Sequence, residues 1–199
     1  MTAWTTRNSY RGAMRRWLGA GGSLSARLAG AGQCFSVQVL NQGRQRLNLD
    51  EARALGLAAI GTGYVREVLL RVDDVAVVFA RSVTTQAQSQ GAWRSIRGLG
   101  TRPLADVLFK RADIARTPLE FAKLKPASSL QRHVVRAWQL ATGEAVTAKT
   151  LPARRSVFRR RGAPLLVMEV FAAQHAPWCW PCSRSAVSKL FCQGNKYEV

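Results

Sequence analysis

The distribution of hydrophobic and polar residues predicts several β-strands. Strict alternation is the pattern of a half-buried strand, and short apolar runs between turn residues are typical of buried ones. The expected strands are residues 34–43, 64–72, 75–84, 154–160 and 164–172. Asp73 and Asp74 separate the second strand from the third, which predicts an antiparallel hairpin. The segment 161–163 separates the last two strands in the same way.

Helices are expected between these strands, because apolar residues recur there three and four positions apart. The predicted helices lie at residues 9–18, 23–28, 50–56 and 100–112, with further helix in parts of 118–142. Ser23 is a suitable cap for the second helix, and Gly56 ends the third. Thr101 and Pro103 mark the start of the fourth. Antiparallel strands with helices between them predict the α+β class.

The composition favours one globular domain with a strong positive charge. The chain has 199 residues, of which 47% are hydrophobic, and 30 Lys and Arg against 11 Asp and Glu give a net charge of +19. No apolar run reaches the roughly 20 residues that a membrane helix needs. The start of the chain has no acid before Asp50, as in an organelle transit peptide, but the excess of Arg continues to Arg184. The features of a secretory signal are also missing, and we therefore expect a cytoplasmic protein.

The charge predicts an anionic partner without giving its size. Nucleic acid is one candidate, since a basic surface binds phosphates. A small dianionic metabolite would be attracted by the same field. Nucleic-acid binding would place exposed aromatic residues among the basic ones. The Trp residues at 17, 93 and 138 fit core packing equally well, so both candidates stay open.

Two charged residues stand on strand faces that are otherwise apolar. Arg66 shares its face with Val68 and Leu70, and Glu169 lies between Val167 and Phe171. The two charges could pair with each other in the core, although such a pair often fails to recover its desolvation cost. Alternatively they line a pocket, where Arg66 would bind a carboxylate and Glu169 would accept a hydrogen bond from a hydroxyl.

Two further groups could join such a pocket. Arg81 shares a strand face with Phe79 on the neighbouring strand and is a possible third charged member. A helix that begins near Thr101 leaves its first amides without partners, so the amide at Leu104 could bind a carboxylate. An ordinary capped helix start would give the same sequence pattern.

Five segments in order resemble the chorismate lyase family. They are "REVLL", "ARSVT", "LGTRPLADVLF", "RRSVF" and "PLLVMEVF". The resemblance runs from about residue 11 to 178 and is strongest over 64–109 and 153–171. It implies a single antiparallel sheet with helices and flaps that enclose an internal ligand pocket. It also implies a bacterial lyase that removes pyruvate from chorismate to give 4-hydroxybenzoate, the aromatic precursor of ubiquinone, without a cofactor.

The resemblance assigns roles to individual residues. It places the arginine that grips the ligand at Arg66, the contacting backbone amide at Leu104 and the site glutamate at Glu169. A flap contact that is usually Met falls on Leu24, and a further family arginine falls on Arg81. We therefore expect Leu24, Arg66, Leu104, Glu169 and Arg81 to bind substrate, with Glu169 and Arg66 catalytic, in a monomer that binds no specific nucleic acid.

Some features lie outside this resemblance. We expect residues 1–178 to form the domain and 179–199 a flexible tail, and residues 113–150 form a longer connection than in compact members. His175, Cys179, Cys182 and Cys192 have spacings that a Cys3His zinc site could use, or they belong to a tail without metal.

A non-catalytic relative is a further alternative. Effector-sensing domains of some transcription regulators share the chorismate lyase fold. They normally follow a winged helix, and we expect the segment before residue 34 to be too short for that module.

Overall fold

The fold is built on one antiparallel sheet of seven strands, seen in a computed structural model that describes residues 2–109 and 112–179. Its strands are β1 (Phe35–Arg46), β2 (Thr62–Val72), β3 (Val75–Thr85), β4 (Ile114–Arg116), β5 (Glu120–Leu124), β6 (Leu151–Arg160) and β7 (Ala163–Phe171). The order across the sheet is β1-β2-β3-β7-β6-β4, and β5 also pairs with β6. The predicted α+β class and single antiparallel sheet are confirmed.

Tight turns join the strand pairs that the sequence predicted. Asp73 and Asp74 have φ of 49° and 61°, which is the left-handed geometry of a type I′ hairpin turn between β2 and β3. Arg161 and Gly162 have φ of 50° and 78° between β6 and β7. Both turns fix the register of their strands, and that register decides which side chains share a face.

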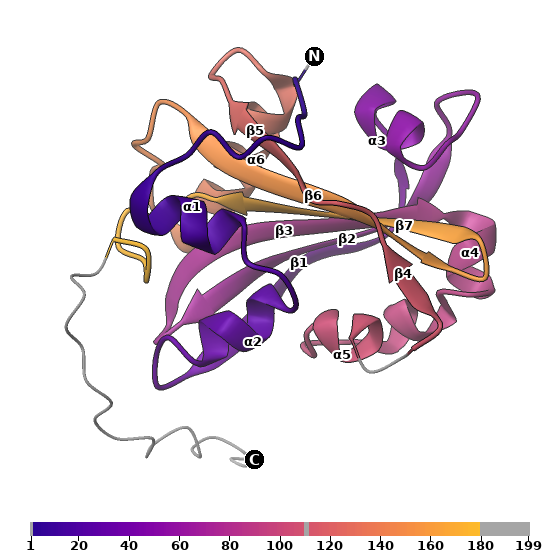
Figure 1. The fold of residues 1–199 in the computed structure, drawn as a ribbon, viewed down its shortest axis with the longest axis horizontal. Coiled ribbons are helices and arrows are strands. Elements are labelled where there is room, and N and C mark those ends of the chain that lie inside the picture. Colours follow the sequence, from indigo (N-terminus) through magenta and orange to yellow (C-terminus); the bar gives the residue numbers. More distant parts are fainter. Residues whose placement is uncertain (1, 110–111, 180–199) are drawn as a thin grey trace.

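Helices cover both faces of the sheet. They are α1 (Gly12–Leu18), α2 (Leu24–Ala29), α3 (Leu49–Ala54), α4 (Gln86–Gln90), the 3-10 helix η1 (Arg94–Gly98), α5 (Ala105–Leu108) and α6 (Ser129–Thr142). Figure 1 shows α2 and α5 below the sheet and α3 above it. Helix α6 lies on the same side as α3, and its Val134 and Trp138 pack against Phe79 and Val170. No helix in the described ranges is long and apolar enough to cross a membrane.

The helices at 23–28 and 50–56 form largely as predicted. The Ser23 hydroxyl accepts a hydrogen bond from the amide of Ala26 at 3.0 Å and so caps α2. Asn48 and Glu51 form a reciprocal capping box at the start of α3. The helix expected at 9–18 starts only at Gly12.

The helix expected at 100–112 is much shorter than predicted. Helix α5 covers only Ala105–Leu108. The preceding turn cannot be helical, because Gly100 has a φ of +54° and the carbonyls of Gly100 and Arg102 point to the side chain of Arg66. The connection at 113–150 contains β4, β5 and α6, and the two strands were not predicted.

Candidate active site

A cavity lies between the sheet and the helices α2 and α5. Its lining residues include Leu24, Arg66, Leu104, Glu169 and Arg81. The volume of the cavity that the centres of water molecules can occupy is about 50 Å³. That is several times the roughly 10–15 Å³ that one water needs. The structure therefore brings the predicted site residues to one internal pocket.

Arg66 is a buried cation without a carboxylate partner in the described part of the chain. Its side chain projects from β2, and the residue is 3% exposed. Nη2 donates to the carbonyl oxygens of Gly100 at 2.8 Å and Arg102 at 3.1 Å. Nε is buried and has no hydrogen-bond acceptor among the described residues. Burial lowers the pKa of this guanidinium because it disfavours the charged form. A bound anion would favour the charged form and so raise the pKa again.

The two flap residues enter the cavity from short helices. Leu24 is the first residue of α2 and is buried. Leu104 immediately precedes α5, in a turn where the amide of Asp106 donates to the carbonyl of Pro103. Because Arg66 binds the carbonyls just before Leu104, the same side chain lines the cavity and holds this flap in place.

Glu169 pairs with an arginine that the sequence analysis missed. Arg154, on the neighbouring strand β6, donates from Nε to the Glu169 carboxylate at 2.5 Å. Its Nη1 also donates to carbonyls at the end of α1, at 3.0 Å to Leu18 and 2.9 Å to Ala20. The core pair between Arg66 and Glu169, considered above as an alternative, does not form. Each charge has its own partners and both border the same cavity.

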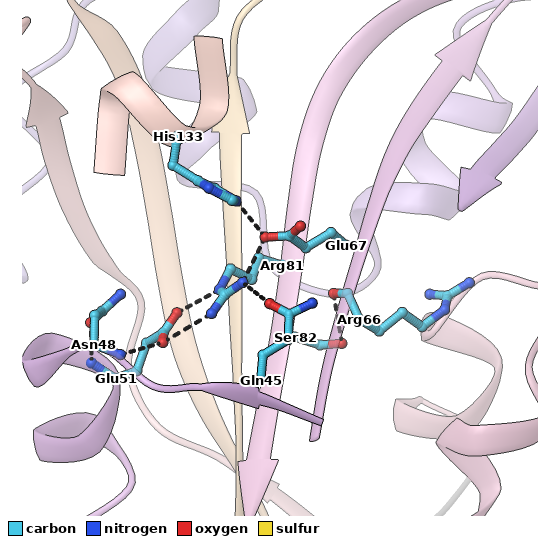
Figure 2. A network of polar contacts seen from close by, with 8 residues as sticks. All are labelled: Gln45, Asn48, Glu51, Arg66, Glu67, Arg81, Ser82 and His133. Carbon is cyan, nitrogen blue, oxygen red and sulfur yellow. Dashed lines mark hydrogen bonds and ion pairs between the residues drawn. The ribbon is translucent and has the colours of Figure 1, made fainter. Parts of the chain in front are cut away.

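The guanidinium of Arg81 lies in a separate polar cluster. Nε donates to Glu51 at 2.6 Å and Nη1 to Glu67 at 2.6 Å, while Nη2 donates to the second oxygen of Glu51. Figure 2 shows Arg81 pointing toward these carboxylates, whereas the guanidinium of Arg66 points away from them. With a further bond from Nη1 to Gln45, these contacts use four of the five N–H groups of Arg81. Among the predicted site residues, Arg81 therefore differs from the rest, because its guanidinium lies with Glu51 and Glu67 and not with Arg66 and Glu169.

The contacts within this cluster shift the pKa values of its members. Burial alone would lower the pKa of Arg81, but the hydrogen bonds and charges of Glu51 and Glu67 raise it. Burial alone would raise the pKa of Glu67, but the hydrogen bond from His133 and the charge of Arg81 hold it below its ordinary value. His133 Nε2 lies 2.6 Å from the Glu67 carboxylate, a contact that the sequence did not indicate.

Arg116 is a second arginine of the cavity that the sequence did not reveal. It projects from the short strand β4 and lines the cavity. Nε donates to the hydroxyl of Ser156 at 2.8 Å, and Nη1 donates to the carbonyl of Gly22 at 3.3 Å. The guanidinium lies 5.1 Å from the ring centroid of Phe158. Burial, together with the positive charge of Arg154, lowers its pKa, with Glu169 acting in the opposite direction.

The possible zinc ligands are only partly within the described residues. Cys182 and Cys192 lie outside them, as does the tail after Cys179. Cys179 is exposed. Over residues 2–109 and 112–179, no three His, Cys, Asp or Glu side chains gather as a metal site. The zinc hypothesis therefore stays an untested prediction.

Comparisons with known proteins define the class of the chain. The sequence model of the family described as chorismate lyase matches residues 4–179. A protein named probable chorismate pyruvate-lyase from Albidiferax ferrireducens is 70% identical over 90% of this chain and 91% of its own length. One with the same name from Cupriavidus metallidurans is 42% identical over 79% of this chain and 72% of its own. The chain belongs to the chorismate lyase family, as its motifs predicted.

Solved structures support the fold independently. The effector domain of PhnF from Mycobacterium smegmatis has a TM-score of 0.52 and 14% identity, covering 76% of this chain and 88% of that one. A structure of PhnF from the same organism has a TM-score of 0.53 and 14% identity, covering 77% of this chain and 64% of that one. At this identity the likeness concerns the fold alone.

Proposed function

We propose that the protein removes pyruvate from chorismate and releases 4-hydroxybenzoate, a precursor of ubiquinone. The observation that carries this proposal is the pairing of two unlike groups in one cavity. Arg66 brings a buried Nε that lacks an acceptor in the described residues, and Glu169 brings a carboxylate. 4-Hydroxybenzoate has a carboxylate and a hydroxyl at opposite ends of its ring. The carboxylate complements Arg66, and the hydroxyl complements Glu169.

The reaction balances without an added oxidant or reductant. The bond between the ring and the ether oxygen breaks, and its electron pair leaves with the oxygen as the enolate of pyruvate. The C–H bond at the hydroxyl-bearing carbon gives its electrons to the ring as the proton departs. The enolate then takes up a proton on carbon, so that one dianion yields two monoanions. Aromatisation supplies much of the driving force.

The residues have separate tasks in this reaction. Arg66 and the amide of Leu104 bind the ring carboxylate, and Leu24 closes the cavity from the α2 side. Glu169 contacts the ring hydroxyl and exchanges a proton during the elimination. Arg154 is a positioning residue, because it holds the Glu169 carboxylate at 2.5 Å. Arg81, bound to two carboxylates, supports the sheet behind the site.

Steady-state kinetics on two variants test these roles. Arg66→Ala should raise KM for chorismate by about 10–100-fold, because a charge-assisted hydrogen bond to the ligand is lost. Glu169→Ala should mainly lower kcat, by about 100-fold or more, because proton exchange is lost. Wild-type values of kcat and KM in both variants would contradict the proposal. Binding of 4-hydroxybenzoate without any turnover of chorismate would instead favour a non-catalytic ligand-binding role.

A further inference from the structure

The side chains that line the cavity carry a net positive charge. Four arginines and one glutamate contribute to its lining, namely Arg66, Arg81, Arg116, Arg154 and Glu169. Arg154 is paired with Glu169, and Arg81 is paired with Glu51 and Glu67. Arg66 and Arg116 donate only to carbonyl and hydroxyl oxygens within the described residues. The cavity therefore presents two guanidinium groups without a carboxylate partner there.

These two groups stand at opposite ends of one row across the sheet. The register places Arg66 beside Ser82, Ser82 beside Val167 and Val167 beside Ser156, whose hydroxyl accepts from Arg116. With strands about 4.8 Å apart, Arg66 and Ser156 stand about 14 Å apart along this row. The residues between them, Ser82 and Val167, both line the cavity.

Arg116 is also on the side where the leaving group must be. It donates to Ser156, which lies two positions from Arg154 on β6, and Arg154 pairs with Glu169. Arg116 and Glu169 are therefore neighbours at one end of the cavity. In chorismate the hydroxyl and the enolpyruvyl ether are on adjacent ring carbons. A substrate whose hydroxyl meets Glu169 therefore directs its ether toward Arg116.

We propose that Arg116 binds the second carboxylate of the substrate, the one on the departing enolpyruvyl group. This inference rests on the proposed function and adds the residue that distinguishes the dianionic substrate from the monoanionic aromatic product. When the ring–oxygen bond breaks, the electron pair moves onto the enolate beside that carboxylate. A guanidinium held by Ser156 and stacked on Phe158 is in place to stabilise that charge before the reaction begins.

The test compares substrate and product on the same variants. Arg116→Gln should lower kcat/KM for chorismate by about 100-fold, because one charged contact to substrate and leaving group is lost. The same variant should bind 4-hydroxybenzoate within about threefold of wild type, because the product lacks the second carboxylate. Arg116→Lys, which keeps the charge, should recover part of the loss. Unchanged affinity for the product also shows that the variant is folded.

A neighbouring arginine provides the matched control. Arg159 is exposed on β6 and pairs in register with Ala115, next to Arg116, but it does not line the cavity. Arg159→Gln removes the same charge from the surface and should leave both kcat/KM and product affinity within about twofold of wild type.

Three results would overturn the inference or its basis. Wild-type kcat/KM in Arg116→Gln contradicts a contact to the substrate. Loss of 4-hydroxybenzoate affinity as large as in Arg66→Ala contradicts a contact confined to the leaving group. If the wild type does not turn chorismate over, the proposed function fails, and equilibrium titrations decide about Arg116 separately. In these titrations, the wild type should bind chorismate more tightly than 4-hydroxybenzoate. Loss of this preference in Arg116→Gln supports the role of Arg116, and a preference that persists in the variant rejects that role.

Discussion

The Nε atom of Arg154 donates to the carboxylate of Glu169 across two adjacent strands, at 2.5 Å. The same guanidinium binds carbonyls at the end of α1 and just after it, so one side chain links the candidate catalytic carboxylate to this helix. Arg154 is 1% exposed. The orientation of Glu169 thus depends on the packing of α1 against the sheet.

Replacing Arg154 with Met should damage both stability and turnover. The substitution leaves the Glu169 carboxylate without its cation and removes the donor from three carbonyls, two in the last turn of α1 and one just after it. Breaking a buried pair in this way costs about 3–5 kcal/mol of the free energy of unfolding. Urea denaturation measures the loss, and kcat for chorismate should fall with it.

The neighbouring Arg155 is the control for Arg154. It pairs with Glu120, whose side chain is 37% exposed, so Arg155→Met should cost only about 1 kcal/mol. Equal stability losses in the two variants would show that the contacts of Arg154 have no special weight.

Arg81→Met should destabilise the protein while sparing ligand affinity. Glu51 and Glu67 would both stay buried without their shared cation, at a cost of about 3–5 kcal/mol in the free energy of unfolding. Titration of 4-hydroxybenzoate into the folded variant should give a Kd within about threefold of wild type. Intact stability with lost affinity would instead restore Arg81 as a ligand contact.

The Glu67 carboxylate should make the protein less stable in acid. Its pKa in the folded state lies below the ordinary value of about 4.3, because His133 and Arg81 favour the charged form. Its contribution to stability is therefore complete above about pH 4.3 and is lost as the pH falls through the lower folded-state value. The free energy of unfolding, measured from about pH 6 to about pH 3, should fall less steeply in Glu67→Gln than in wild type. Identical slopes in both proteins would contradict this role.

Two serine caps separate the effect of the α2 flap from that of helix stability. Ser23 accepts from the amide of Ala26, and Ser128 accepts in the same way from Gln131 at the start of α6. Each Ser→Ala change should cost about 1 kcal/mol. Only Ser23→Ala should also raise KM for chorismate, because Leu24 follows that cap and lines the cavity. An equal rise of KM in Ser128→Ala would mean that KM reports general stability.

Much of the sheet was predictable because its strands have clear physical signals. Alternation and tight turns defined β2, β3, β6 and β7, and a charge on an apolar face identified Arg66 and Glu169. Strand β4 has only three residues, too few to show any period, and this hid Arg116. Arg154 was hidden for another reason. In a chain with so many arginines, an inward one resembles its exposed neighbours until the pairing of strands is known.

Register and tertiary contacts explain the remaining differences. Arg81 stands opposite Glu67 rather than Arg66, and adjacent residues on a strand face opposite sides of the sheet. The sequence of one strand cannot show this arrangement, because it depends on how β2 and β3 pair. The helix predicted at 100–112 is short because Arg66, more than thirty positions earlier, binds the carbonyls of Gly100 and Arg102.

The central claim is that Arg66 and Glu169 hold the two ends of one aromatic acid. A crystal structure of the protein with 4-hydroxybenzoate tests it most directly. We expect the carboxylate of the ligand within hydrogen-bonding distance of Arg66 Nε and the Leu104 amide, and its hydroxyl at Glu169. A ligand bound outside this cavity, or one that touches neither side chain, would contradict the account.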